Sequence, residues 1–201
     1  MQATADAVSL VLASGSRYRA AQLRQLGIAF RSEAPDVDEG ARPGETAVTL
    51  AARLARDKAL TVAARHPGAV VVGSDQVAEL DGRRLGKPGD AARARAQLAA
   101  ASGRTVEFVS AVHVVDGRGP TPRREHAGLA RTRATLRTLS AAEIERYVER
   151  DAPLDCAGAF KVESLGITLF ERVEADDPSA LVGLPLIATC RLLRGCGFAL
   201  P

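Results

Sequence analysis

Ala69-Val-Val-Val-Gly-Ser74 is the strongest strand-forming segment of the chain, and the arrangement of its neighbours follows from it. An apolar, β-branched run of this kind is typical of a central strand that is covered on both faces. Asp75 and Gln76 follow directly, at the carboxyl end of the predicted strand. Because α/β folds place their ligands at such ends, Asp75 is a candidate to bind a metal ion or to accept a proton from water. The alternative is an Asp that caps a turn.

The segments on both sides of this strand alternate between strand and helix patterns, which indicates an α/β fold. Further strands are predicted over 8–13, 28–32, 106–115, 130–136 and 167–173, and helices over 17–26, 46–65, 90–101, 140–150 and 185–193. Asp81-Gly82 predicts a hairpin turn, and Ser140 with Glu143 predicts a capping box. The neighbouring strands in the middle of the chain favour a mixed sheet. There is no internal repeat or long linker, so we expect a single domain over residues 1–201.

Composition narrows the class of protein. The chain has 201 residues, 46% hydrophobic and 25% charged, as in a folded globular protein. Its longest apolar run, 69–73, is too short to cross a membrane, and residues 1–6 lack the basic start of a signal peptide. Cys156, Cys190 and Cys196 form an odd set without metal-ligand spacing, which predicts reduced thiols in a cytoplasmic protein. A net charge of +3 and 3% aromatic residues favour a small anionic ligand over nucleic acid.

The basic residues are divided very unequally. Of 27 basic residues, only Lys58, Lys87 and Lys161 are lysines, and the others are arginines. A lysine retained against this bias suits a site that needs a compact point charge, such as a phosphate site. Lys58 lies on the apolar stripe of the helix predicted over 46–65, where a lysine either snorkels or reaches into a site. The alternative is that an arginine-rich chain retains three lysines by chance.

Ser14-Gly-Ser16 joins a predicted strand to a predicted helix, with Arg17 and Arg19 close behind. Free backbone N–H groups and hydroxyls at the start of a helix bind anions well. The turn is therefore a candidate phosphate site, although it lacks the glycine spacing and the lysine of a Walker loop. An ordinary helix cap with solvated arginines is the alternative.

Carboxylates follow the second predicted strand at Glu33 and in the stretch Asp36-Val-Asp38-Glu39. Mg²⁺ and similar hard cations prefer carboxylate oxygens. Glu33 and Asp75 together are the predicted ligands of a divalent cation, Mg²⁺ or Mn²⁺. A solvated acidic loop is the commoner meaning of such a run.

Six short motifs occur along the chain in an order that is specific as a set: Leu12-Ala-Ser-Gly-Ser-Arg-Tyr-Arg19, Val37-Asp-Glu39, Val72-Gly-Ser-Asp75, Leu85-Gly-Lys-Pro88, Ser102-Gly103 and Cys156-Ala-Gly158. From about residue 9 to residue 194 the chain resembles the Maf family of nucleotide pyrophosphatases. The resemblance implies an elongated mixed sheet flanked by helices, with a nucleotide bound in a cleft between two lobes and hydrolysed between its α- and β-phosphates. Asp75 matches the family's catalytic carboxylate. The residues that match its phosphate and metal site are Ser14, Arg19, Glu33, Lys58 and Lys87.

Three positions resemble the branch of the family that acts on 7-methyl-GTP, namely Tyr18, Gln76 and Glu163, and Lys161 matches a further position that the family keeps. The resemblance implies that these four residues bind the substrate. A Glu163 carboxylate would accept hydrogen bonds from the N–H edge of guanine, and Tyr18 could stack on a base made cationic by N7-methylation. In one departure from the family, Arg17 stands where a proline is usual, at a helix position that proline pre-organises but does not define.

The sequence therefore predicts a cytoplasmic, metal-dependent hydrolase of a nucleotide, with no nucleic-acid or membrane partner and with homodimers as one assembly that the resemblance allows. Two alternatives stay open. One is the same reaction on dTTP and UTP. The other is a non-catalytic nucleotide-binding regulator of cell division or septum formation.

Overall fold

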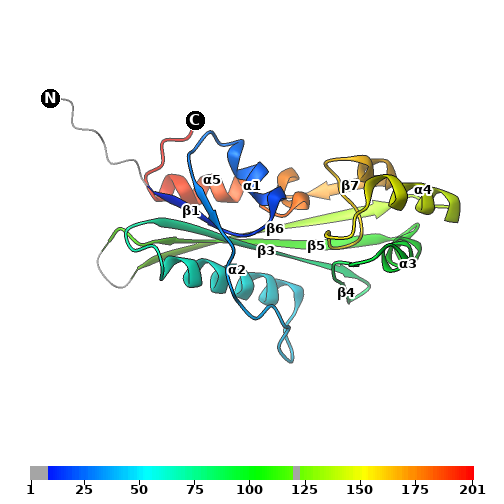
Figure 1. Ribbon diagram of the computed structural model, residues 1–201, viewed down its shortest axis with the longest axis horizontal. Helices are drawn as coiled ribbons and strands as arrows, with labels where there is room; N and C mark the ends of the chain where they lie inside the picture. Colours follow the sequence, from blue (N-terminus) through cyan, green and yellow to red (C-terminus); the bar gives the residue numbers. More distant parts are fainter. Residues whose placement is uncertain (1–8, 120–122) are drawn as a thin grey trace.

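The computed structural model describes residues 9–119 and 123–201, and its centre is one mixed seven-stranded sheet (Figure 1). The strand order is β2 (Arg31–Glu33), β1 (Leu10–Ala13), β3 (Val70–Leu80), β5 (Thr105–Asp116), β6 (Arg124–Leu136) and β7 (Phe170–Ala175), with β4 (Arg83–Leu85) paired to β3. β1 runs parallel to β2 and β3, and the other pairs are antiparallel. The α/β class and the mixed sheet are thus confirmed. Val8 and the predicted absence of a signal peptide in residues 1–6 lie outside the described residues.

The helices cover both faces of the sheet (Figure 1). α1 (Arg17–Arg24) and α5 (Leu186–Gly195) lie on one face and α2 (Ala47–Ala63) on the other, while α3 (Ala91–Ala101) and α4 (Ala141–Asp151) lie at the far end. Two short 3₁₀ helices, η1 (Leu165–Leu169) and η2 (Pro178–Val182), precede and follow β7. All five predicted helices are present, within three residues of their predicted ends. No helix in the described part of the chain is long and apolar enough to span a membrane.

Local signals place several element ends where the sequence predicts them. Ser140 and Glu143 form the predicted capping box at the start of α4, and Ser16 caps α1 by accepting from the N–H of Arg19. Asp81 and Gly82 both have positive φ, at 47° and 75°, as a type I′ hairpin turn requires at its two central residues. The sequence therefore encodes these ends locally.

β3 is the predicted central strand, but it is longer than expected. Val70, Val71 and Val72 are fully buried, with Val70 and Val72 packed toward α1 and α5 and Val71 toward α2. The strand continues through Asp75 to Leu80, so Asp75 lies inside a strand rather than at its carboxyl end. β1 pairs with β3 only as far as Gly73, and β4 pairs with it only from Ala78. Among the described residues no strand lies beside 74–77 on this side, so Asp75 still lies just beyond the end of a parallel strand.

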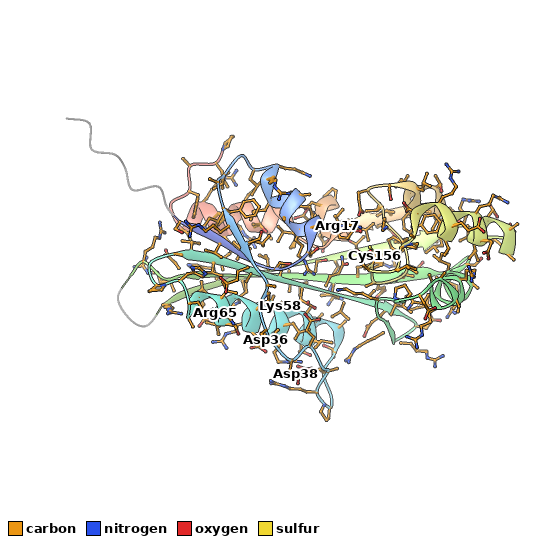
Figure 2. The ribbon with its side chains drawn as sticks, viewed as in Figure 1. Arg17, Asp36, Asp38, Lys58, Arg65 and Cys156 are labelled. Atoms are coloured by element: carbon orange, nitrogen blue, oxygen red, sulfur yellow. The ribbon has the colours of Figure 1, made fainter. Side chains whose placement is uncertain are left out.

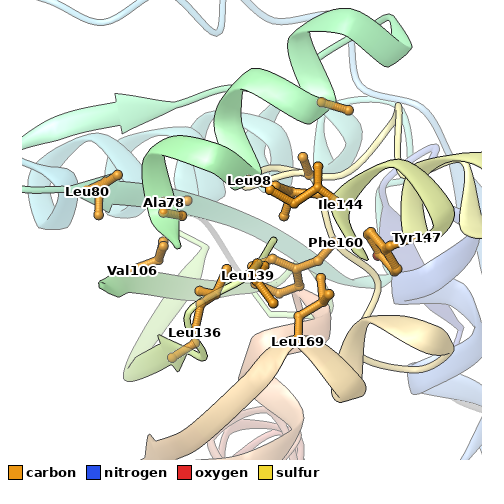
Figure 3. Packing of buried hydrophobic residues seen from close by; sticks show 14 of the residues in the cluster. Ala78, Leu80, Leu98, Val106, Leu136, Leu139, Ile144, Tyr147, Phe160 and Leu169 are labelled. Atoms are coloured by element: carbon orange, nitrogen blue, oxygen red, sulfur yellow. The ribbon is translucent and has the colours of Figure 1, made fainter. Parts of the chain in front are cut away.

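Four hydrophobic clusters lie along the sheet. One packs the first half of β3 and β1 against α1 and α5, and two lie under α2 on the opposite face. The other lies under α3 and α4, where Leu98, Ile144 and Phe160 belong to one cluster (Figure 3). Phe160 packs edge-on against Phe108 and Phe170. β3 and β5 contribute residues to the first of these clusters and to the last.

Gly73 sets the distance between α2 and the sheet. A Cβ atom at this position would lie 2.7 Å from the backbone nitrogen of Ala59 and would also collide with the carbonyl oxygen of Ala55. Only glycine therefore allows α2 to pack directly on β3. Lys58, on α2, owes its position beside Asp75 to this contact.

Gly73→Ala should destabilise the protein by about 3 kcal/mol or more, because the new methyl group meets backbone atoms that cannot move aside. Urea denaturation of the purified protein measures this loss. The control is Gly195→Ala, where a Cβ atom meets nothing within 4 Å, and we expect a change within about 1 kcal/mol. Equal stabilities of the two variants would contradict the close packing at Gly73.

Candidate active site

A cavity of about 710 Å³ lies where β3 has no neighbouring strand. Its lining residues include Lys58 of α2, Arg17 of α1 and Cys156, which are labelled in Figure 2. The lining segments are residues 14–19, 34–39, 75–78, 84–87, 155–163 and 181–183 in part, together with Leu50, Leu54 and Lys58 of α2.

Lys58 is the centre of the polar end of the cavity. Its side chain is only 6% exposed, and its Nζ atom lies 2.7 Å from Asp75 Oδ1 and 2.6 Å from Glu39 Oε1. Asp75 is also buried, whereas Glu39 is exposed to the cavity and the solvent. A lysine on the apolar stripe of α2 thus reaches a site instead of extending to the surface.

Arg19 and Lys87 add two cations to this end. Burial lowers the pKa of Arg19, and the charges of Asp75 and Glu39 partly offset that effect. Arg19 Nε donates to the Gly183 carbonyl at 2.9 Å, which fixes the direction of its guanidinium. Lys87 lines the cavity on the loop after β4, and its charge contributes to a lowered pKa of Glu39. Burial alone would raise the pKa of Glu39, but the hydrogen bond and charge of Lys58 outweigh it.

The turn before α1 forms the adjoining wall. Ser14, Gly15 and Ser16 all line the cavity, and Ser14 Oγ accepts from the Ser16 N–H at 3.1 Å. The first turn of α1 follows with Arg17, Tyr18 and Arg19. Hydroxyls and a helix start therefore lie beside the three cations, as an anionic ligand would need.

Comparison with known proteins adds to this geometry. Residues 9–196 match the family model described as "Maf-like protein". The chain belongs to the Maf family. It is similar to a 7-methyl-GTP pyrophosphatase of Xanthomonas axonopodis pv. citri (strain 306), at 55% identity over 192 residues, 96% of this chain and 98% of the relative. It is also similar to one of Albidiferax ferrireducens (strain ATCC BAA-621 / DSM 15236 / T118), at 52% over 188 residues, 94% and 93% of the two chains. Among solved structures, a Ham1 protein of Staphylococcus aureus has a TM-score of 0.48 and 14% identity, over 94% of this chain and 97% of that one.

Glu33, predicted as a metal ligand of this Maf chain, does not reach the cavity. Its two carboxylate oxygens lie 2.6 Å from His66 Nε2 and 2.6 Å from Arg65 Nη1, and these two partners, His66 first, lower its pKa. Glu33 lies at the end of β2, where it pairs with Ala13 of β1. The carboxylate that contacts Lys58 belongs to Glu39, six residues further along the chain. In the structure Glu39, and not Glu33, is therefore the carboxylate that lies with Asp75 beside Lys58. The motif Val37-Asp-Glu39 was the signal that could have identified Glu39.

Lys161 also departs from its predicted place. It does not line the cavity, and its Nζ atom donates to the carbonyls of Asp151 at 2.6 Å and Ala152 at 3.0 Å. It thus satisfies carbonyl groups at the end of α4 and holds the loop that follows.

Tyr18, Gln76 and Glu163, the three positions that resemble the 7-methyl-GTP branch, all line the cavity. Tyr18 and Glu163 both lie near Cys156, and this part of the cavity is called its base end. Gln76 Nε2 donates to Ser110 Oγ at 3.0 Å and to the Ala180 carbonyl at 2.9 Å, so its amide group is held in one orientation.

Two residues that the sequence did not single out as ligands, Asp155 and Cys156, complete this end. Burial raises the pKa of the Cys156 thiol to about 12. The thiol therefore stays neutral at ordinary pH, which argues against a role as a nucleophile.

The polar end of the cavity suits a divalent cation that is shared with a substrate. Glu39 and Asp75 both contact Lys58 Nζ, so their oxygens cannot be farther apart than the sum of those two short distances. Mg²⁺ is commonly held by one or two carboxylates together with phosphate oxygens. In the described part of the chain no three Asp, Glu, His or Cys side chains form a complete cage, so phosphate and water would have to supply the remaining ligands.

Lys58→Met should destabilise the protein by about 3 kcal/mol, because it leaves Asp75 buried without its partner. Asp75→Asn in the same background should recover part of the loss, since the double variant no longer buries an unpaired charge. Urea denaturation of both single variants and the double variant gives the coupling. Losses that simply add would mean that Lys58 and Asp75 do not interact.

Proposed function

We propose that this chain hydrolyses 7-methyl-GTP to 7-methyl-GMP and pyrophosphate, as a single domain over residues 1–201. The observation that carries the proposal is that one cavity holds Arg19, Lys58 and Lys87 with Glu39 and Asp75 at its polar end, Tyr18 and Glu163 at its base end, and Gln76 on its wall. The polar end suits a triphosphate with a metal ion, and the base end suits a purine base. The names of the close relatives support the same substrate.

The reaction follows from these positions. Arg19, Lys58 and Lys87 bind phosphate oxygens and spread their charge, while Asp75 holds a water molecule and accepts its proton as it attacks. The bond from water oxygen to the α-phosphorus forms as the bond from that phosphorus to the bridging oxygen breaks, and pyrophosphate leaves. Mg²⁺ or Mn²⁺, held by Glu39, Asp75 and phosphate oxygens, would neutralise part of the phosphate charge. Lys58 also orients Asp75, since the two are hydrogen-bonded.

The cavity and the cysteines support a small-molecule substrate and a cytoplasmic location. A nucleotide-sized cavity with a cationic end suits a small-molecule substrate. Cys156, Cys190 and Cys196 are free, which supports a protein of the reducing cytoplasm.

The substrate is tested with purified protein, Mg²⁺ and four nucleotides: 7-methyl-GTP, GTP, dTTP and UTP. We expect pyrophosphate release to be fastest with 7-methyl-GTP, and Asp75→Asn to abolish it while the melting temperature shows a folded protein. Faster turnover of dTTP or UTP would support the alternative substrate. Tight nucleotide binding without pyrophosphate release would support the regulator.

The metal ligands are tested by comparing Glu39→Gln with Glu33→Gln. Glu39→Gln should raise the Mg²⁺ concentration needed for half-maximal activity by about tenfold, because it removes a carboxylate from the cavity. Glu33→Gln should have a much smaller effect, since Glu33 is bonded to Arg65 and His66. The opposite order of effects would return Glu33 to the metal site.

A further inference from the structure

Arg17, Tyr18 and Asp155 form a cluster at the base end of the cavity, and all three line it. The Arg17 guanidinium carbon lies 4.8 Å from the centre of the Tyr18 ring, and its Nη2 atom donates to the Tyr18 hydroxyl at 2.6 Å. The same Nη2 atom lies 3.5 Å from Asp155 Oδ2, and the Tyr18 hydroxyl lies 3.2 Å and 3.3 Å from the two Asp155 oxygens. A planar cation thus lies over an aromatic ring with a carboxylate at its edge.

The Arg17 side chain can leave this cluster without disturbing the fold. The side chains of Arg17 and Asp155 are 72% and 51% exposed, and an ion pair so exposed is weak. Arg17 occupies the first position of α1, and the helix is capped by Ser16, so the fold does not depend on the Arg17 side chain. If Arg17 swings into the solvent, the ring of Tyr18 and the carboxylate of Asp155 remain in place.

The loop that carries Asp155 is anchored on both sides. Lys161 holds the carbonyls of Asp151 and Ala152 before it, and the Leu154 carbonyl accepts from the Gly89 N–H at 3.0 Å. The carboxylate is also ionised at ordinary pH. Burial alone would raise the pKa of Asp155, but hydrogen bonds from its own backbone, Cys156 and Tyr18 hold it below its usual value.

A guanidinium and an N7-methylated guanine have the same recognition chemistry. Each is a planar, delocalised cation with N–H donors at its edge, so each can stack on an aromatic ring and donate to a carboxylate. Neutral guanine offers the edge but not the positive charge. The cluster can therefore discriminate between two bases that differ only by one methyl group and its charge.

We propose that Asp155 is a specificity-determining residue that, with the Tyr18 ring, binds a cationic purine base, and that Arg17 occupies this subsite until the base displaces it. The proposal rests on the proposed function, since it names what selects the base at the same site. Glu163 lines the same end of the cavity and adds to its negative charge. Arg17, at a position where the family usually has proline, then acts as an internal competitor of the substrate.

The test measures binding without turnover. Titration calorimetry of the full-length protein with 7-methyl-GMP and with GMP, at mildly acidic pH where the methylated base is fully cationic, compares two ligands that differ by one methyl group. The wild-type protein should bind 7-methyl-GMP about tenfold more tightly than GMP. Asp155→Asn should remove most of this preference while leaving GMP affinity within about twofold. Tyr18→Leu, which removes the ring, should have the same effect if Asp155→Asn does not fold.

Arg17→Ala tests the internal competitor, and Glu149→Gln is the charge control that matches Asp155→Asn. Arg17→Ala should tighten 7-methyl-GMP binding several-fold, because the subsite is then empty. Glu149→Gln removes one negative charge from an exposed position on α4, outside the cavity, and should leave the preference unchanged.

The outcomes separate this proposal from the proposed function. An equal loss of both ligands in Asp155→Asn, or no wild-type preference for the methylated base, would overturn the role of Asp155. Unchanged or weaker 7-methyl-GMP binding in Arg17→Ala would overturn the role of Arg17. Failure of the proposed function would instead appear as no pyrophosphate release from 7-methyl-GTP by the wild-type protein.

Discussion

The direct packing of α2 on β3 at Gly73 is the contact on which the rest of the molecule depends. Without a side chain at Gly73, the backbone of Ala55 and Ala59 can rest against the strand, on the turn of α2 that carries Lys58. A larger separation would leave the Lys58 ammonium short of Asp75, its buried partner. A backbone contact inside the core thereby sets the position of the charged groups in the cavity.

The charges of the cavity depend on one another. Lys58 is buried, and an unpaired ammonium there would be costly, so Asp75 and Glu39 make its charged form tolerable. Arg19 is buried as well, and the same two carboxylates oppose the effect of burial on its pKa. Each carboxylate thus offsets the burial of two cations, and in the proposed reaction each would also bind a ligand. The exposed position of Glu39, on a loop rather than a strand, leaves it the freer of the two to change partners.

Much of this could be predicted from the sequence, because the signals are local. The valines of β3, the caps of α1 and α4 and the Asp81-Gly82 turn each encode their own structure over a few residues. What could not be predicted depends on where the chain turns between elements. Glu33 and Glu39 are both acidic and both follow β1 and α1, and only the path of the loop decides which of them meets Lys58. Lys161 and Asp155 are similar cases: their roles are set by the end of α4 and the loop after it, which no short-range pattern describes.

The continuity of β3 and β5 limits how the molecule can move. Both strands run beneath the cavity and belong to the cores at its two ends, so no flexible joint separates the walls that would face a nucleotide. Rotation of one wall toward the other would bend the hydrogen-bonded pair of β3 and β5. We therefore expect a ligand to be enclosed by rearrangement of loops and side chains at the rim of the cavity. The part of the sheet formed by β3 and β5 should keep its shape throughout the catalytic cycle.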